Sequence, residues 1–127
     1  MTMLEVKSDN SIYLTKGDSG VLNITVTGSD VSTLTLKFTV RNAQNLDNEM
    51  FSITQGEVIP EGQTVYGVID HTPGSNTWTL RIYKAATSAM KRKKYYYDFS
   101  LENTAEIGGD KITFVGGGQV KTEFWVT

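Results

Sequence analysis

The sequence predicts an all-β protein, built as an antiparallel sandwich or small barrel of about eight short strands. Apolar and polar residues alternate with a period of two over several stretches, which is the pattern of half-buried strands. Turn signals rich in glycine separate these stretches at intervals of roughly 10 residues. The 127 residues suffice for one two-layer core, so we expect a single domain over 1–127.

The clearest strand covers residues 95–101. One face is apolar, at Tyr95, Tyr97, Phe99 and Leu101, and the other carries Tyr96, Asp98 and Ser100. A helix would spread the aromatic residues around its circumference, whereas a strand places them on one side. We therefore expect the other strands to cover the apolar face of this one.

The N-terminal elements are short. Residues 1–10 are polar and without pattern, and we expect a loose lead-in or an edge strand there. A short strand follows over 12–14, where two aliphatic residues flank Tyr13. Residues 16–20 then form a turn, with glycines where a positive φ is favoured.

Two longer alternating strands come next, over 21–27 and 34–41, separated by a break at 28–30. In both strands aliphatic or aromatic residues occupy one face and polar residues occupy the other. Consecutive strands of this kind usually pair, so we expect them to form an antiparallel hairpin.

The middle of the chain has the weakest pattern. Residues 42–63 are rich in Gln, Asn, Glu and Gly, and we expect a long connection with one short strand. We expect its apolar residues to pack on the core: Met50, Phe51 and Ile53. A weak strand pattern covers 65–69, and a turn punctuated by Pro-Gly follows over 71–76.

The C-terminal part returns to clear strands. Trp78, Leu80 and Ile82 alternate with polar residues, and the alanines of 84–94 favour one or two helical turns near 84–93. After the central strand we expect a hairpin turn at 108–110, a strand through Ile112 and Phe114, a turn at 116–118 and a last strand over 120–126.

Composition narrows the function classes. The net charge of −2 argues against a nucleic-acid partner, which usually demands a strongly basic face. The absence of cysteine excludes a disulfide framework and a thiolate metal site. We find no signal peptide pattern and no apolar run near the roughly 20 residues that cross a bilayer. We therefore expect a soluble protein made in the cytoplasm, with no membrane partner.

Gly17-Asp18-Ser19-Gly20 copies the letters around the nucleophile of chymotrypsin-like proteases. A triad also needs a histidine base and a buried carboxylate, and His71, the single histidine, lies downstream of the serine rather than upstream. We expect an ordinary β-turn here and no enzyme. A lone histidine beside Pro73 and Gly74 is expected to be a solvated loop residue, and we expect no metal and no cofactor.

Two further motifs have a structural and a functional interpretation. Gly116-Gly117-Gly118 lies between two strand patterns, so a hairpin turn is favoured over a phosphate loop, which leads from a strand into a helix. The basic run from Lys91 to Lys94 precedes three tyrosines, an arrangement that can hold single-stranded nucleic acid. Because Tyr95 and Tyr97 are needed inside, we favour a solvated helix end or a protein contact.

Outward aromatic residues are the main candidates for binding. Counting along the strands places Tyr13, Tyr83, Tyr96 and Trp125 outside the core, and tyrosine and tryptophan are residue types that anchor interfaces. The candidate interface residues are Tyr13, Tyr83, Lys91, Arg92, Lys93, Lys94, Tyr96 and Trp125. The alternative is that other parts of the chain cover this face.

Five motifs occur in an order that matches a known family. They are Ile12-Tyr13-Leu14-Thr15-Lys16-Gly17-Asp18-Ser19, Phe38-Thr39-Val40-Arg41, Ile69-Asp70-His71-Thr72, Tyr95-x-Tyr97-Asp98-Phe99-x-Leu101, and the stretch from Gly118 to Val126-Thr127. With these motifs the chain resembles the N-terminal domain of phage baseplate upper proteins and related tail proteins of phages that infect Gram-positive bacteria. In the larger proteins of this family the domain continues into helical and receptor-binding parts. We therefore expect this chain to be a stand-alone version of the N-terminal domain.

The resemblance implies an antiparallel Ig-like β-sandwich of about 7–9 short strands, located in the virion of a phage or prophage. It implies a non-enzymatic structural protein whose partners are other tail or baseplate proteins. Association of the chain with copies of itself, as a homo-oligomer, is left open. We expect contacts through outward aromatics and through the edge of the last strand, ending at Thr127. The alternative is a carbohydrate-binding module for adhesion to the host surface, which would need several rings aligned on one exposed face.

Overall fold

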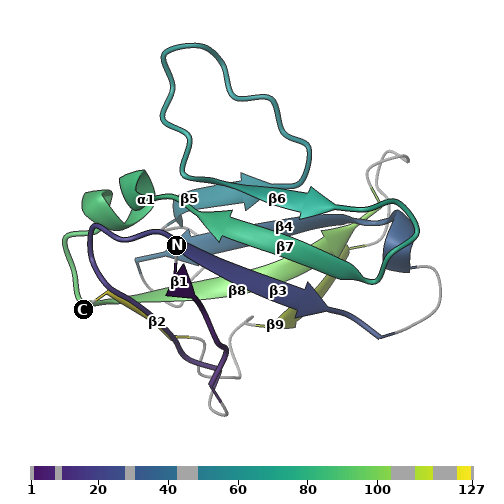
Figure 1. Cartoon of the computed structure of the whole chain (residues 1–127), viewed down its shortest axis with the longest axis horizontal. Helices are drawn as coiled ribbons and strands as arrows, with labels where there is room; N and C mark the ends of the chain where they lie inside the picture. The colour runs from purple at the N-terminus through teal and green to yellow at the C-terminus, as the bar shows by residue number, and fades with distance from the viewer. Residues whose placement is uncertain are drawn as a thin grey trace.

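The computed structural model describes residues 2–7, 10–27, 31–42, 49–103, 111–115 and 123–126. Ten strands in these residues form two facing sheets, one of four strands and one of six, as Figure 1 shows. The predicted all-β sandwich is therefore confirmed. No helix among the described residues is long and apolar enough to cross a membrane.

The four-stranded sheet has the order β1 (Thr2–Met3), β3 (Gly20–Thr25), β7 (Thr77–Ile82) and β6 (Gly67–His71). β3, β7 and β6 are antiparallel, and β1 joins β3 in parallel. The inner face of this sheet is made of large aliphatic residues and one tryptophan, all buried: Leu22, Ile24, Ile69, Trp78, Leu80 and Ile82.

The six-stranded sheet has the order β2 (Ile12–Leu14), β10 (Glu123–Val126), β8 (Lys94–Glu102), β4 (Thr35–Arg41) and β5 (Glu49–Thr54). β9 (Lys111–Val115) pairs with the second half of β8, whereas β10 pairs with the first half. All pairs are antiparallel except β2 with β10. β8 is thus the central strand, as its pattern predicts.

This strand order is that of immunoglobulin-like domains. In the four-stranded sheet, strand B corresponds to β3, strand E to β7 and strand D to β6. In the six-stranded sheet, strand C′ corresponds to β5, strand C to β4, strand F to β8 and strand G to β9 and β10 together. A 3-10 turn, η1 (Val31–Thr33), precedes β4, and the helix α1 (Lys84–Ala89) connects β7 to β8. The short helix expected near 84–93 is therefore present, anchored by buried Ala86 and Met90.

An aromatic cluster forms the centre of the core. The ring of Phe38 lies 4.9 Å from that of Phe99, 5.8 Å from that of Tyr97 and 6.3 Å from that of Phe124, measured between centroids. These residues come from β4, β8 and β10, which are neighbours in one sheet. Their tilted contacts suit aromatic rings, which avoid direct face-to-face stacking.

The predicted hairpin of 21–27 with 34–41 is wrong. β3 pairs with β1 and β7, whereas β4 pairs with β5 and β8, so the two strands belong to different sheets. In a sandwich the inner faces of both sheets are apolar. Two alternating strands therefore show the same pattern whether they lie side by side or face each other across the core.

β9 and β10 both run antiparallel to β8, so these two strands point in the same direction. The turns expected at 108–110 and 116–118 themselves lie outside the described residues, as do Val120 and Thr122 of the last strand.

In the described part of residues 1–10, Thr2–Met3 form an edge strand and residues 4–7 follow without regular secondary structure. β1 pairs with β3, and the following Leu4 is only 7% exposed. A Cβ atom at Gly20 would come within 2.7 Å of the Leu4 side chain, so glycine at this position makes room for it. The N-terminal residues therefore contribute to the core.

Candidate interaction surface

The structure divides the eight predicted interface residues into two groups and one outlier. Four of them lie on adjacent strands of the six-stranded sheet and form what we call the ladder: Tyr13, Trp125, Lys94 and Tyr96. Three others form the basic turn between α1 and β8: Lys91, Arg92 and Lys93. Tyr83 precedes α1 next to the four-stranded sheet and makes no ring contact among the described residues.

The ladder follows the strand register. Trp125 of β10 lies opposite Tyr13 of β2 on one side and opposite Lys94 of β8 on the other. The Tyr13 and Trp125 rings are nearly parallel, at 9° and 6.1 Å between centroids. The Lys94 Nζ lies 5.5 Å from the centroid of the Trp125 ring and 5.7 Å from that of Tyr96, both within cation–π range.

Both faces of the Trp125 indole are therefore in contact with neighbouring side chains. Tyr13 is the outermost member, because β2 is the edge strand, and it is 46% exposed. Trp125, Lys94 and Tyr96 are half-buried. The ladder thus presents one open ring face at the sheet edge and a row of ring edges behind it.

The sheet face beside the ladder is closed. Arg41 lies opposite Tyr96, and its guanidinium contacts the Asp98 carboxylate at 3.1 Å. The two side chains are only 15% and 13% exposed. Thr39 and Ser100 point away from the aromatic core and are nevertheless buried. The part of this outer face around Arg41, Asp98, Thr39 and Ser100 is therefore covered.

The expected pairing of the last strand with another chain is contradicted by the sheet order. β10 lies inside the sheet, with its residues 124–126 paired to β2 and 123–125 paired to β8. The backbone N–H of Val126 also donates to the carbonyl of Lys93 at 2.8 Å. Because the short β2 strand fills this edge, β10 offers no row of unpaired backbone groups.

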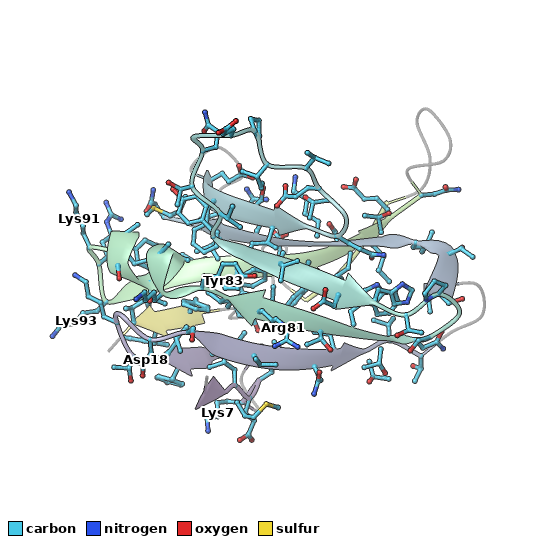
Figure 2. All side chains as sticks on the ribbon, turned by 45° about the horizontal axis from the view of Figure 1, so that its top comes forward. Lys7, Asp18, Arg81, Tyr83, Lys91 and Lys93 are labelled. Carbon is cyan, nitrogen blue, oxygen red and sulfur yellow. The ribbon has the colours of Figure 1, made fainter. Side chains whose placement is uncertain are left out.

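The basic turn is exposed and is held in shape by the core. Figure 2 shows Lys91 and Lys93 at one end of the molecule, with their side chains directed away from it. The Tyr95 hydroxyl accepts a hydrogen bond from the Arg92 backbone N–H at 2.9 Å. A hollow of about 280 Å³ opens beside the turn, lined by Asn42, Met50, Ala89, Lys91, Arg92 and Tyr95.

The prediction that His71 is a solvated loop residue is wrong. It is the last residue of β6, half-buried, and its ring stacks on that of Trp78 at 4.5 Å and 10°. Its Nε2 lies 2.7 Å from the Ser75 carbonyl oxygen, which only accepts, so the neutral ring carries its proton there. Among the described residues no group of three or more His, Cys, Asp and Glu could hold a metal ion.

Gln55 links this histidine to the core, and sequence patterns missed it. Its Oε1 accepts hydrogen bonds from the Trp78 indole N–H at 2.9 Å and from the Leu36 backbone N–H at 3.0 Å. Its amide nitrogen lies 3.4 Å from Nδ1 of His71. A buried tryptophan needs an acceptor for its N–H. The strand pattern places Trp78 in the core, so the sequence indicates that some acceptor exists but does not identify Gln55.

The turn predicted over 16–20 is present in its first part, over residues 15–18, whereas Gly20 of the Gly-Asp-Ser-Gly motif already begins β3. The Asp18 N–H donates to the Thr15 carbonyl at 3.0 Å, and Gly17 has φ of +84°. Thr87 of α1 fastens this turn, accepting from the Gly17 N–H at 3.1 Å and donating to the Asp18 carbonyl at 2.8 Å.

Ser19 and His71 lie at opposite ends of the four-stranded sheet. The residue after Ser19, Gly20, pairs with Ile82 at the end of β7, whereas His71 pairs with Trp78 near its beginning. The structure therefore does not bring the serine and the histidine of the protease-like motif together.

Comparison with known proteins returned no matching family model and no matching curated protein.

Proposed function

We propose that this chain is a non-enzymatic module for protein–protein contact. More particularly, we propose that it is a structural component of a phage or prophage particle, placed in the baseplate or tail and in contact with other proteins there. The observation that carries the proposal is the ladder, because it combines the residue types that anchor protein interfaces on an open part of a sheet.

The position of the family-like motifs supports this proposal. The motifs containing Tyr13, Tyr96 and Trp125 fall on β2, β8 and β10, and the motif from Phe38 to Arg41 falls on β4. These four strands are consecutive neighbours in one sheet. The segments with which the chain resembles phage tail proteins therefore include the strands that carry the candidate contact residues.

The ladder is suited to binding because its side chains are already ordered. An exposed aromatic residue that binds a partner usually loses rotamer freedom, which weakens the association. Here Trp125 is held between Tyr13 and Lys94 before any partner arrives. We expect a partner to cover the exposed face of Tyr13 and the edges of the rings behind it, excluding water from the cation–π contact.

The proposal is tested by deleting the gene from a phage or prophage that encodes the chain and examining the particles by electron microscopy. We expect particles without a complete tail or baseplate. Assembly should be restored by the wild-type chain and not by the Tyr13→Ala/Trp125→Ala variant, with Lys7→Ala as a surface control. Particles of normal form and infectivity without the chain would contradict the proposal.

One observation favours a carbohydrate-binding module as the alternative: the outer ring face of Tyr13 is open, and a sugar could stack on it. Trp125 offers no second free face, because Tyr13 and Lys94 lie on either side of it. Tyr13 is the most exposed of the ladder rings, so such binding would depend mainly on it. Glycan-array binding that is lost in Tyr13→Ala and retained in Tyr83→Ala would support this alternative.

A further inference from the structure

The connection between β5 and β6 forms a projecting arm, which we define as residues 55–66. Figure 1 shows it rising clear of both sheets. Short-range hydrogen bonds shape it: the Glu57 N–H donates to the Thr54 carbonyl at 3.2 Å, and the Gln63 N–H donates to the Pro60 carbonyl at 3.1 Å. Gly56 and Gly62 have φ of +70° and +88°, which favour glycine. The arm is therefore a shaped element with its own turns.

The arm carries an apolar side chain into the solvent. Val58 is 91% exposed, the highest value among the large apolar residues that the structure describes. The arm contains two carboxylates, Glu57 and Glu61, and no lysine or arginine. A partner surface that is apolar at its centre and basic at its rim would complement an apolar residue between two acidic residues on a projecting loop.

The hollow beside the basic turn has these properties. Met50, Ala89 and Tyr95 contribute apolar atoms to its lining, while Lys91 and Arg92 contribute cations. In the part of the chain that the structure describes, neither cation is paired with a carboxylate. With about 280 Å³, the hollow is slightly smaller than typical small-molecule pockets and has room for a few aliphatic side chains.

We propose that the arm of one copy of this chain docks into the hollow of a second copy. Val58 would enter the hollow against Met50 and Tyr95. Glu57 and Glu61 would lie near Lys91 and Arg92 at its rim. The arm does not occupy the hollow of its own chain, since Val58 is almost fully exposed.

The contact joins two different surfaces, so it is of the head-to-tail kind. Such contacts build closed rings or open helical filaments, depending on the rotation between neighbours. The inference deepens the proposed function by naming one partner, another copy of the chain, and it rests on the proposed function only for the particle in which the assembly would occur. The ladder stays available for a different protein, because it shares no residue with the arm or with the lining of the hollow.

The first test is the solution mass of the purified chain, measured by light scattering over about a hundredfold range of concentration. We expect the wild type to associate as concentration rises. Val58→Asp and Lys91→Glu/Arg92→Glu should each weaken association by at least about tenfold. Gln63→Asp on the arm and Lys7→Glu elsewhere should leave it unchanged, and circular dichroism should show that all variants are folded.

Mixing the two defective variants makes the test specific. The Val58→Asp chain retains an intact hollow, and the Lys91→Glu/Arg92→Glu chain retains an intact arm. Each should be monomeric alone, whereas the mixture should form a one-to-one heterodimer that does not grow further. A ring or filament is impossible in this mixture because each dimer contains only one functional contact.

Two results would overturn the inference. A wild-type chain that is monomeric at every concentration excludes docking between copies. A wild-type oligomer that both variants leave intact places the contact between copies elsewhere. Either result would leave the proposed function standing if the chain is still required for tail assembly in the deletion experiment, so the two failures are distinguishable.

Discussion

The hydroxyl of Tyr95 accepts a hydrogen bond from the backbone N–H of Arg92, three residues earlier, at 2.9 Å. Tyr95 is 2% exposed and begins the apolar face of β8, the strand in the place of strand F. Immunoglobulin-like domains have a tyrosine at this corner whose hydroxyl bonds to the backbone upstream. The contact ties the basic turn to the core, so the shape of a candidate binding surface depends on a core residue.

Tyr95→Phe should lower the free energy of unfolding by about 1–2 kcal/mol, because it removes the acceptor for the Arg92 N–H and leaves the ring in place. Chemical denaturation monitored by fluorescence measures this change. The matched control is Tyr96→Phe on the adjacent residue, which preserves the ring beside Lys94. Equal stabilities of the two variants would show that the corner hydrogen bond contributes nothing.

Gln55→Met should destabilise the protein by at least about 2 kcal/mol, since one side-chain oxygen accepts from both Trp78 and Leu36 and each buried donor left unpaired costs about 1–3 kcal/mol. Thermal or urea unfolding measures the loss. Gln63→Met, an exposed position on the same connection, serves as the control. A loss no larger than that of the control would mean that water replaces the Gln55 oxygen.

Gly67→Ala should lower stability by about 2–3 kcal/mol through overpacking. A Cβ atom at this position would lie 2.2 Å from the Arg81 carbonyl oxygen and 2.6 Å from Cδ1 of Ile53, which belongs to the opposite sheet. The backbone of β6 or of the neighbouring β7 must shift to accept it, and the Ile53 side chain must move as well. Val68→Ala, at the next and half-buried position, should cost no more than about 1 kcal/mol. If both substitutions cost the same, the close contacts of Gly67 with the Arg81 backbone and the Ile53 side chain are not a constraint.

A double-mutant cycle on Tyr13 and Trp125 should give a coupling energy of about 0.5–1.5 kcal/mol, the range for stacked aromatic pairs. Each residue is replaced by alanine alone and together, and the free energies of unfolding are compared. Tyr83 with Trp125 is the control pair, and its coupling should be near zero because the two rings make no contact. Additive effects for Tyr13 and Trp125 would contradict the stacked ladder.

Local alternation was sufficient to predict most of the strands. The pattern through Tyr95 and Leu101 identified β8, and the alanines after Tyr83 identified α1, because both signals depend on near neighbours in the chain. Sheet membership was not predictable in this way. The strands 21–27 and 34–41 alternate equally well, and nothing in the pattern distinguishes lateral pairing from packing across a core.

The candidate site was predicted only in part. Tyr13, Tyr96 and Trp125 could be placed outside the core by counting along strands, but their stacking with Lys94 depends on the order of β2, β10 and β8, and β2 is remote from the other two in sequence. The sequence of the arm shows neither the period of a strand nor that of a helix, so no pattern indicated that Val58 would be exposed. Gln55 and Thr87 act through side-chain hydrogen bonds to segments distant in sequence, which no periodic pattern records.

The most direct measurement of the central claim is quantitative mass spectrometry of purified particles from a host that encodes the chain. We expect the chain in the particle fraction, in constant ratio to the other tail proteins and enriched together with tails after the particles are disrupted. Cross-links from Lys94 to another tail protein would identify the partner of the ladder. A chain present in the cell lysate but absent from intact particles would contradict the proposal that it is a virion structural protein.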